Sequence, residues 1–237
     1  MDIERNLSIV RERIAAAARA AGREPESIRL VAVTKTFPAE SGAAAFRAGV
    51  FDLGENRVEE ARDKVPAVSE ILGGSTGPRW HLIGHLQRRK ARDAVQLFDL
   101  IQSVDTVRVA QALNRRAADI GKFIPVLLQV NVARDPDKFG FIPDPRDAFY
   151  ASVAEILALP ALQVRGLMTI GALVPDAEQA RPFFRDLREL RDELAARFPA
   201  VDWSELSMGM TDDFPVAISE GATIIRVGRA IFGERKE

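Results

Sequence analysis

The chain has 237 residues, and its 33 Lys and Arg residues nearly balance its 34 Asp and Glu residues, for a formal net charge of -1. This balance argues against the basic surface that nucleic-acid-binding domains and proteins of anionic membranes usually carry. The chain has no cysteine, which excludes disulfides, thiolate metal sites and cysteine nucleophiles.

The first predicted element is an amphipathic helix at about residues 3–21, because apolar residues recur there at helical spacing and Gly22 is well placed to end it. The N-terminal segment alternates charged and apolar residues, unlike a signal peptide. No segment approaches the roughly 18 apolar residues that a membrane span needs. We therefore expect a cytoplasmic protein without a membrane or nucleic-acid partner.

Short runs rich in Val, Ile and Leu then alternate with longer amphipathic stretches. Strands are predicted at residues 28–34, 51–54, 79–84, 100–104, 124–131, 164–170, 203–209 and 223–228. Helices are predicted at residues 39–48, 56–72, 88–98, 106–120, 145–158, 178–198 and 212–220. Runs that are apolar on both faces, such as residues 30–33, are typical of a parallel sheet covered by helices on both sides.

This alternation predicts an α/β fold, namely a single-domain (β/α)8 TIM barrel over residues 1–237, since such barrels take about 250 residues. An open doubly wound sheet alternates strands and helices in the same way. The chain has no G-x-G-x-x-G motif after its first strand, which disfavours the dinucleotide-binding version of that alternative.

In a TIM barrel the active site lies at the carboxyl ends of the strands. Lys35 follows the first predicted strand directly, and a partly desolvated amine is nucleophilic and forms a Schiff base with an aldehyde. The structural alternative is a lysine that extends to solvent or pairs with a carboxylate such as Glu55.

The loops after the seventh and eighth predicted strands offer a phosphate site. The first is Ser207-Met208-Gly209-Met210-Thr211-Asp212-Asp213, with a hydroxyl, backbone N–H groups and N-cap candidates at Thr211 or Asp212; the second is Gly228-Arg229-Ala230. Phosphate groups of barrel ligands usually bind at these two loops. Simple helix capping is the alternative, but together with Lys35 the loops suit a phosphorylated aldehyde.

Arg226 shares a strand face with Ile224 and Gly228. If that face points inward, the guanidinium lies beside the phosphate loops, where a ligand ring would lie. An arginine that donates to a pyridine nitrogen keeps it unprotonated and makes the ring a weak electron sink. A structural ion pair is the alternative.

His81 and His85 do not predict a metal site. Four residues along a strand span about 13 Å, too far for one ion. We expect them to be core or capping residues. The single tyrosine, Tyr150, falls in a predicted helix, away from the strand ends.

Several segments, in chain order, resemble those of the pyridoxal phosphate homeostasis proteins, the PLP-binding YggS/PROSC family. They are Val31-Ala32-Val33-Thr34-Lys35-Thr36, Gly54-Glu55-Asn56, Trp80-His81-Leu82-Ile83-Gly84, Gln129-Val130-Asn131, Gly166-Leu167-Met168-Thr169, Leu206-Ser207-Met208-Gly209-Met210-Thr211-Asp212-Asp213 and Arg226-Val227-Gly228-Arg229-Ala230-Ile231-Phe232-Gly233. The likeness covers almost the entire chain. It implies a barrel like the N-terminal domain of alanine racemase.

The resemblance also implies a site for pyridoxal 5′-phosphate (PLP). Lys35 would carry the cofactor as an aldimine, Asn56 would lie near the ring substituents, and Arg226 would face the pyridine nitrogen. Ser207 and the backbone around Gly209, Gly228 and Arg229 would hold the phosphate, and Met168 and Thr211 complete the expected set. Arg229 departs from the family, which often has a hydroxyl residue there.

The function implied is intracellular PLP (vitamin B6) homeostasis, in which the protein buffers the cofactor or delivers it to apo-enzymes without robust turnover. The alternative is a PLP-dependent amino-acid racemase or related enzyme of low activity. A two-base racemase needs a second acid or base opposite the lysine. A phosphate-binding barrel enzyme without PLP, using Lys35 as a charged clamp, is a third possibility.

Overall fold

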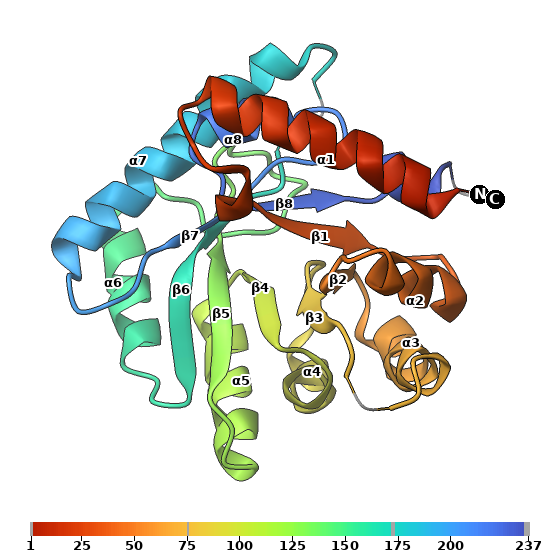
Figure 1. Cartoon of the computed structure of the whole chain (residues 1–237). Coiled ribbons are helices and arrows are strands. Elements are labelled where there is room, and N and C mark those ends of the chain that lie inside the picture. Colours follow the sequence, from red (N-terminus) through yellow and green to blue (C-terminus); the bar gives the residue numbers. More distant parts are fainter. Residues whose placement is uncertain (1, 75, 172–173, 235–237) are drawn as a thin grey trace.

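The computed structural model describes residues 2–74, 76–171 and 174–234, and its parallel strands close into a barrel in the order β1-β2-β3-β4-β5-β6-β7-β8 (Figure 1). The strands are β1 (Arg29–Val33), β2 (Asp52–Glu55), β3 (Arg79–Leu82), β4 (Leu100–Val104), β5 (Ile124–Gln129), β6 (Leu162–Met168), β7 (Glu205–Ser207) and β8 (Ile224–Val227). Every predicted strand is present. The pairing of β1 with β8 excludes the open sheet.

Helices follow the strands and surround the barrel. They are α1 (Ile3–Ala20), α2 (Ala39–Arg47), α3 (Val58–Ile71), α4 (Ala91–Leu97), α5 (Val107–Asp119), α6 (Arg146–Leu157), α7 (Arg181–Arg197), α8 (Phe214–Ser219) and α9 (Arg229–Phe232). The predicted starts at residues 88 and 178 fall in 3-10 turns that precede α4 and α7. The sequence did not predict α9, whose 4 residues are too few to show a helical period.

Helix α1 precedes the first strand and packs against α8 and α9, the two shortest helices (Figure 1). Its apolar face buries Leu7, Val10, Ile14 and Ala18. The Asn6 side chain donates to the carbonyl of Ile231 in α9 over 2.9 Å. Helix α1 therefore covers a part of the barrel wall that these short helices leave uncovered.

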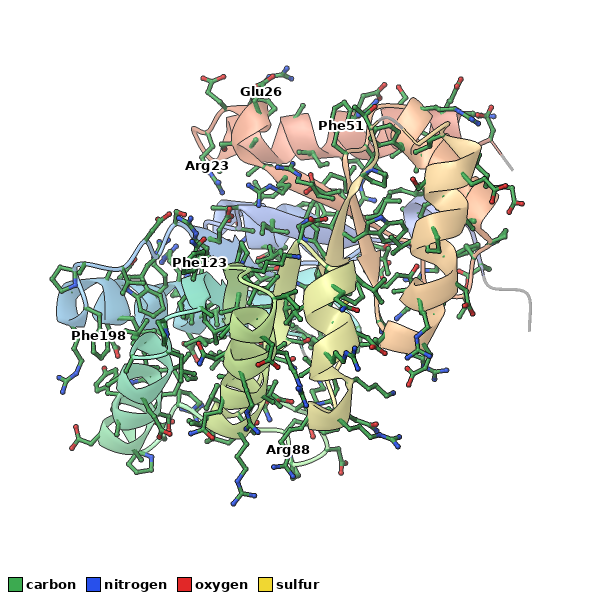
Figure 2. The ribbon with its side chains drawn as sticks, turned by 90° about the horizontal axis from the view of Figure 1, so that it is seen from below. Arg23, Glu26, Phe51, Arg88, Phe123 and Phe198 are labelled. Atoms are coloured by element: carbon green, nitrogen blue, oxygen red, sulfur yellow. The ribbon has the colours of Figure 1, made fainter. Side chains whose placement is uncertain are left out.

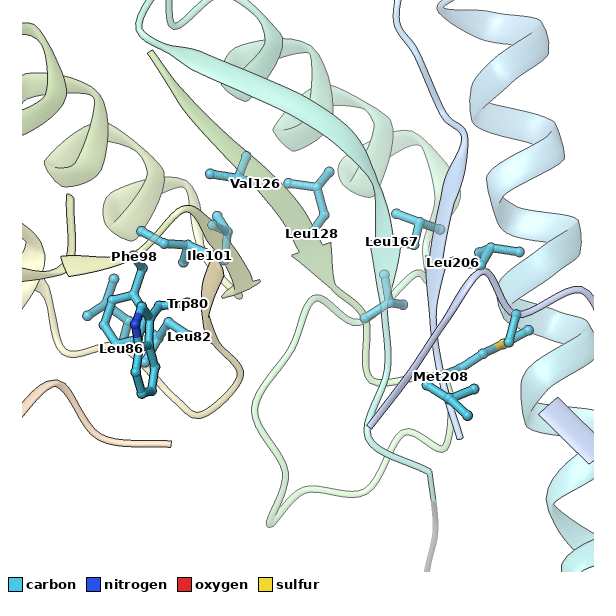
Figure 3. Packing of buried hydrophobic residues seen from close by; sticks show 14 of the residues in the cluster. Trp80, Leu82, Leu86, Phe98, Ile101, Val126, Leu128, Leu167, Leu206 and Met208 are labelled. Atoms are coloured by element: carbon cyan, nitrogen blue, oxygen red, sulfur yellow. The ribbon is translucent and has the colours of Figure 1, made fainter. Parts of the chain in front are cut away.

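The main hydrophobic core lies between the strands and the helices, where alternate strand residues such as Leu82, Ile101, Leu128 and Leu167 point outward (Figure 3). A second, small cluster fills the inside of the barrel. Its members are Val31, Leu100, Leu127, Met168 and Ile224. Buried polar side chains, among them Gln102, Ser207 and Arg226, also lie inside the barrel.

Residues before and after the strands mark the two ends. Phe51 and Phe123 precede β2 and β5, whereas Arg88 follows β3, and Figure 2 shows Arg88 on the side away from the other two. The carboxyl ends of the strands, where the site is expected, lie on the Arg88 side. No helix in the described ranges is long and apolar enough to cross a membrane.

Candidate functional site at the carboxyl ends of the strands

Lys35 lies in the turn after β1, partly exposed. The Thr34 N–H donates to the carbonyl of Gly54 over 3.0 Å, so the chain stays extended beside β2 until this residue. Lys35 therefore follows the alternation of Val31, which points into the barrel. The turn places the lysine at the carboxyl end of the barrel, where the site is expected.

Hydrogen bonds fix the residues on both sides of Lys35. The carbonyl of Thr34 accepts from Lys64 Nζ of α3 over 2.7 Å, and the Thr34 hydroxyl donates to Glu55 over 2.6 Å. The Thr36 N–H donates to Glu60 Oε1 over 2.5 Å. Thr36 has φ +68°, a conformation that non-glycine residues adopt only where the surroundings enforce it.

Lys64 is the central residue of the hydrogen bonds that hold the turn at Lys35, and we call this group of bonds the Lys35 anchor. Its ammonium group lies 2.7 Å from a carboxylate oxygen of Glu55 and 2.7 Å from one of Glu60, and only 6% of its side chain is exposed. Burial raises the pKa of Glu55, while the hydrogen bonds from Lys64 and Thr34 oppose that effect. Glu55 thus pairs with Lys64 on the outer side of the strand.

Sequence reasoning missed Lys64 and Glu60. Their spacing of four residues in a predicted helix indicated only an i,i+4 pair, which usually lies in solvent. The fold turns this face of α3 toward the end of β1. The pattern that could have revealed them is a lysine four residues after Glu60, on a predicted helix that begins just after Glu55.

The turn after β7 is tight because Gly209 has φ +91°. A Cβ at Gly209 would lie 2.6 Å from the Cβ of Ala217 in α8. The carboxylate of Asp213 accepts from the Met210 N–H over 2.6 Å and holds this turn. The N-cap residue of α8 is Asp213, so the prediction of Thr211 or Asp212 was wrong.

The turn after β8 lies against the end of β1. A Cβ at Gly228 would lie 3.3 Å from the carbonyl oxygen of Val33. The Arg229 side chain forms an ion pair with Asp212, which joins the two turns. Within the described ranges, the N–H groups of Gly209, Thr211, Gly228 and Arg229 donate to no acceptor. These donors suit an anion.

Arg226 points into the barrel, as predicted, and is 4% exposed. Its Nη1 donates to Ser207 Oγ over 2.6 Å and its Nη2 to the carbonyl of Thr169 over 2.8 Å. Burial lowers its pKa to about 10, and the Asp213 carboxylate opposes that effect. Arg226 therefore stays charged at neutral pH, although both of these hydrogen bonds go to neutral oxygens.

Ser207 is bonded inside the barrel in this structure. Its side chain is completely buried, and its hydroxyl donates to Gln102 Oε1 over 2.5 Å while it accepts from Arg226. The hydroxyl is thus used inside the barrel and is not directed at the turns. Met168 is likewise completely buried, in the apolar cluster inside the barrel.

Asn56 follows β2 at the mouth and is half-buried. Its backbone packs against the turn after β3, because a Cβ at Gly84 would lie 2.3 Å from the carbonyl oxygen of Asn56. His85 follows this turn, where its Nδ1 lies 2.7 Å from Asp105 and its ring stacks on Phe139 at 3.7 Å. His81 lies deep in the barrel, 2% exposed.

The arrangement fits a phosphorylated ligand with an aldehyde and a ring nitrogen. The adjacent strands β1, β7 and β8 carry an amine at the rim, the N–H donors of two joined turns and a buried guanidinium. The hydrogen bonds of this guanidinium to the described residues go to neutral oxygens. A metal ion is not suggested, since the described residues contain no group of three or more His, Cys, Asp or Glu that could hold one.

Comparison with known proteins identifies the family of this chain. A family model described as the N-terminal domain of alanine racemase matches residues 5–236. The pyridoxal phosphate homeostasis protein of Escherichia coli (strain K12) is 42% identical over 237 residues, which cover 99% of this chain and 97% of that protein. The chain belongs to the pyridoxal phosphate homeostasis proteins. The family resemblance inferred from the sequence segments is thereby confirmed.

Other members and structures extend the comparison. The family member of Aquifex aeolicus is 40% identical over 230 residues, covering 97% of both chains. The structure of PipY of Synechococcus elongatus PCC7942, with PLP bound, has a TM-score of 0.83 at 37% identity and covers 98% of this chain and 100% of that one. The alanine racemase of Clostridium difficile 630 matches with a TM-score of 0.69 at 15% identity, which shows the shared barrel fold alone.

Proposed function

We propose that this protein binds PLP at the carboxyl ends of its strands and serves PLP homeostasis in the cytoplasm. The PLP bound to PipY, at 37% identity over 98% of this chain, supports the choice of ligand. The observation that carries the proposal is the convergence of Lys35, the two turns and Arg226 on neighbouring strands.

Each group has a distinct role in the proposed complex. The Lys35 amine forms a C=N bond with the aldehyde carbon of PLP, and the aldehyde oxygen leaves as water. The N–H groups around Gly209, Thr211, Gly228 and Arg229 bind the phosphate. Arg226 donates to the ring nitrogen and so keeps it unprotonated.

The remaining predicted residues have indirect or peripheral roles. Asn56 lies near the ring substituents. Met168 contributes to the apolar layer under the mouth. Ser207 orients Arg226 and leaves the phosphate to the turns. The bound PLP is then available for transfer to PLP-dependent apo-enzymes. PLP itself supplies electron-withdrawing ring chemistry, but the chain's own residues here bind and orient it.

A borohydride experiment tests the proposal. Protein incubated with PLP should absorb in the near-visible range and lose that absorbance on reduction with borohydride. Peptide mass spectrometry should then place the reduced pyridoxyl adduct on Lys35. The Lys35→Ala variant should show no such absorbance, whereas Lys90→Ala, at a lysine in the 3-10 turn before α4, should behave as the wild type. An adduct at another lysine, or none, would reject the assignment.

A further inference from the structure

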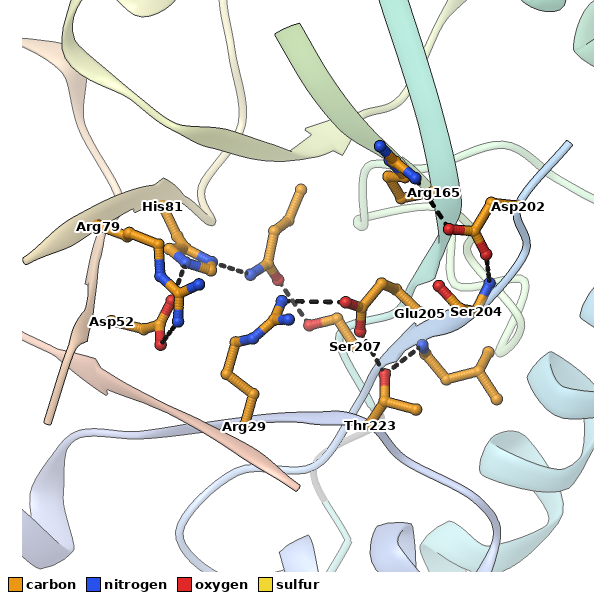
Figure 4. A network of polar contacts seen from close by, with 12 residues as sticks. Arg29, Asp52, Arg79, His81, Arg165, Asp202, Ser204, Glu205, Ser207 and Thr223 are labelled. Carbon is orange, nitrogen blue, oxygen red and sulfur yellow. Dashed lines mark hydrogen bonds and ion pairs between the residues drawn. The ribbon is translucent and has the colours of Figure 1, made fainter. Parts of the chain in front are cut away.

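A chain of hydrogen bonds crosses the inside of the barrel from Arg226 to the opposite end. Arg226 Nη1 lies 2.6 Å from Ser207 Oγ, which lies 2.5 Å from Gln102 Oε1. Gln102 Nε2 lies 2.8 Å from His81 Nδ1, and His81 Nε2 lies 2.9 Å from Asp52 Oδ1. Figure 4 shows the part that contains His81, Asp52 and Ser207. Every side chain in this series of hydrogen bonds is nearly or completely buried.

The two end groups of this series, Arg226 and Asp52, determine which atom donates in every hydrogen bond between them. A guanidinium can only donate, so Ser207 Oγ accepts from Arg226 and its own O–H donates to Gln102. At the other end Asp52 can only accept, because His81 and Arg79 hold its pKa below the usual value against the effect of burial. His81 therefore carries a proton on Nε2, and its Nδ1 accepts from the Gln102 amide.

The His81 end opens into a polar cavity of about 280 Å³ at the N-terminal end of the barrel (Figure 4). The charged groups around it are paired: Arg79 with Asp52 at 2.7 Å, Arg29 with Glu205 at 3.0 Å and Arg165 with Asp202 at 2.9 Å. Asp99 also lines the cavity. These are the ionisable groups that face His81, and the cavity gives water and protons access to it.

Building on the proposed PLP site, we propose that His81 and Gln102 are positioning residues for Arg226, so that protonation of His81 at one end of the barrel alters PLP binding at the other. A proton on His81 Nδ1 would face the Gln102 amide donor. The amide must then rotate and present its N–H to Ser207. Ser207 Oγ would receive two donors, and its own proton would lose its acceptor, Gln102 Oε1.

This rearrangement acts directly on the group that holds the ring nitrogen. Arg226 has Ser207 as one of its two hydrogen-bond partners among the described residues. Competition from Gln102 for the Ser207 oxygen weakens that bond, and a buried polar chain responds as a unit because each bond polarises the next. Acid therefore weakens PLP binding through His81, and by linkage PLP binding favours neutral His81.

The bond directions can be tested without PLP. The chain has 2 histidines, so nitrogen NMR of ¹⁵N-histidine-labelled protein gives a simple spectrum. At about pH 7.5, where an ordinary histidine is neutral, we expect the His81 proton on Nε2, and His85→Asn assigns the signals. A proton on Nδ1 would overturn the proposal whether or not PLP binds.

The coupling is tested by the PLP dissociation constant, measured from near-visible absorbance between about pH 7.5 and about pH 5.5, across the ordinary histidine range. We expect the wild type to lose about threefold to tenfold more affinity over this range than His81→Asn, since one pKa unit of coupling corresponds to about tenfold. Asn cannot titrate but keeps an acceptor for Gln102. His85→Asn should keep the wild-type pH response.

Gln102→Leu provides a second, independent break in the hydrogen-bond chain, and it should show the same reduced pH response as His81→Asn. Thermal unfolding identifies a variant that has not folded, in which case the other variant decides. The proposal is overturned if both folded variants keep the wild-type response or if His85→Asn removes it. If the wild type binds no PLP, the proposed function fails, whereas the NMR result on His81 still stands.

Discussion

Arg226 Nη1 and Ser207 Oγ, on the neighbouring strands β8 and β7, are 2.6 Å apart inside the barrel. Ser207, which the family resemblance assigns to the phosphate, therefore also supports the arginine expected to face the ring nitrogen. In the proposed site the phosphate binds at the two turns that Arg229 and Asp212 join. We propose that phosphate and ring recognition depend on different residues, which mutations can separate.

Ser207→Ala is expected to weaken the binding of PLP and of pyridoxal, which lacks the phosphate, by the same amount. The loss should be about 1–3 kcal/mol, the usual effect of removing a hydrogen bond to a charged group. Arg229→Ala, which breaks the ion pair that joins the two turns, should weaken PLP binding and leave pyridoxal binding unchanged. Absorbance titrations of both variants with both ligands measure this. A loss confined to PLP in Ser207→Ala would restore its direct role at the phosphate.

Lys64→Met should destabilise the protein strongly. It leaves Glu55, completely buried, without its cationic partner, and unpaired buried charges typically cost about 3–5 kcal/mol. Lys90→Met is the matched control, because Lys90 pairs with the exposed Glu59 and such pairs contribute only about 0–1 kcal/mol. Urea unfolding at neutral pH compares the two.

Lys64→Met also tests the Lys35 anchor, the hydrogen bonds that hold the turn at Lys35. Without Lys64, the carbonyl of Thr34 loses a donor and the turn is held by fewer bonds. Any folded Lys64→Met protein should therefore form its Lys35 adduct with PLP more slowly or more weakly than Lys90→Met. Equal adduct formation would show that Lys64 contributes to stability alone.

The sequence was sufficient to predict the barrel, and the reason is visible in its strands. Parallel strands buried on both faces read as continuous apolar runs, and the helices between them have a clear period. The carboxyl ends of the strands then lie at one end of the barrel, which places Lys35, Gly209 and Gly228 together. These inferences need only local patterns and a general rule of the fold.

The partners of the polar side chains could not be predicted in this way. Ser207 and Gln102 are 105 positions apart, and their contact depends on which strand faces which across the barrel. The pairing of β4 with β5 shifts its register between Ile101 and Val104, which changes the alternation there. Whether a polar residue faces the mouth, the interior or a helix is therefore a property of the closed barrel.

Glu220→Gln tests a cluster that holds α8, the helix that follows the β7 turn. Glu220 pairs with Arg181, Arg185 and Arg188 of α7 at 2.9–3.4 Å. Burial raises its pKa, but hydrogen bonds from Arg181 and Arg185 and the charges of Arg188 and Arg185 outweigh that, so the net pKa is lowered.

A lowered carboxyl pKa stabilises the folded state above the unfolded value of about 4.3, and the contribution disappears as the pH falls through the folded value. Glu220→Gln should therefore be less stable than the wild type at about pH 7, where ordinary carboxylates are ionised. The difference should shrink as the pH falls below about 4.3 and then through the lower folded value, because Glu220 then becomes protonated in both states. Urea unfolding across this range measures it. A difference that is constant with pH would mean that the charge of Glu220 is irrelevant.

Arg226→Gln should separate stability from binding. Burial lowers the Arg226 pKa to about 10, which corresponds to a cost of roughly 3 kcal/mol for keeping the charge inside the barrel at neutral pH. Gln removes that charge and still offers a donor to Ser207. The variant is expected to unfold at a temperature equal to or above that of the wild type without PLP, while its PLP affinity falls. A large drop in unfolding temperature would show that Arg226 serves the fold.

Racemisation of alanine is expected to be far slower than the common enzymatic turnover of about 10 per second. Lys35 can serve as one base, but Tyr150 lies on α6 and donates to Glu193, away from the mouth. His85 is the histidine at the mouth, and there Asp105 and Phe139 hold its ring. Arg226 also limits carbanion stabilisation if it keeps the ring nitrogen unprotonated.

The assay follows D-alanine formation from L-alanine with saturating PLP, using Lys35→Ala as the blank and His85→Asn as a second comparison. Slow exchange of the α-proton by a single base is compatible with a PLP carrier, so a trace rate does not alter the assignment. A turnover near the enzymatic value that is lost in Lys35→Ala would make the protein a racemase. If His85→Asn also abolished it, His85 would be the second base that a two-base mechanism requires.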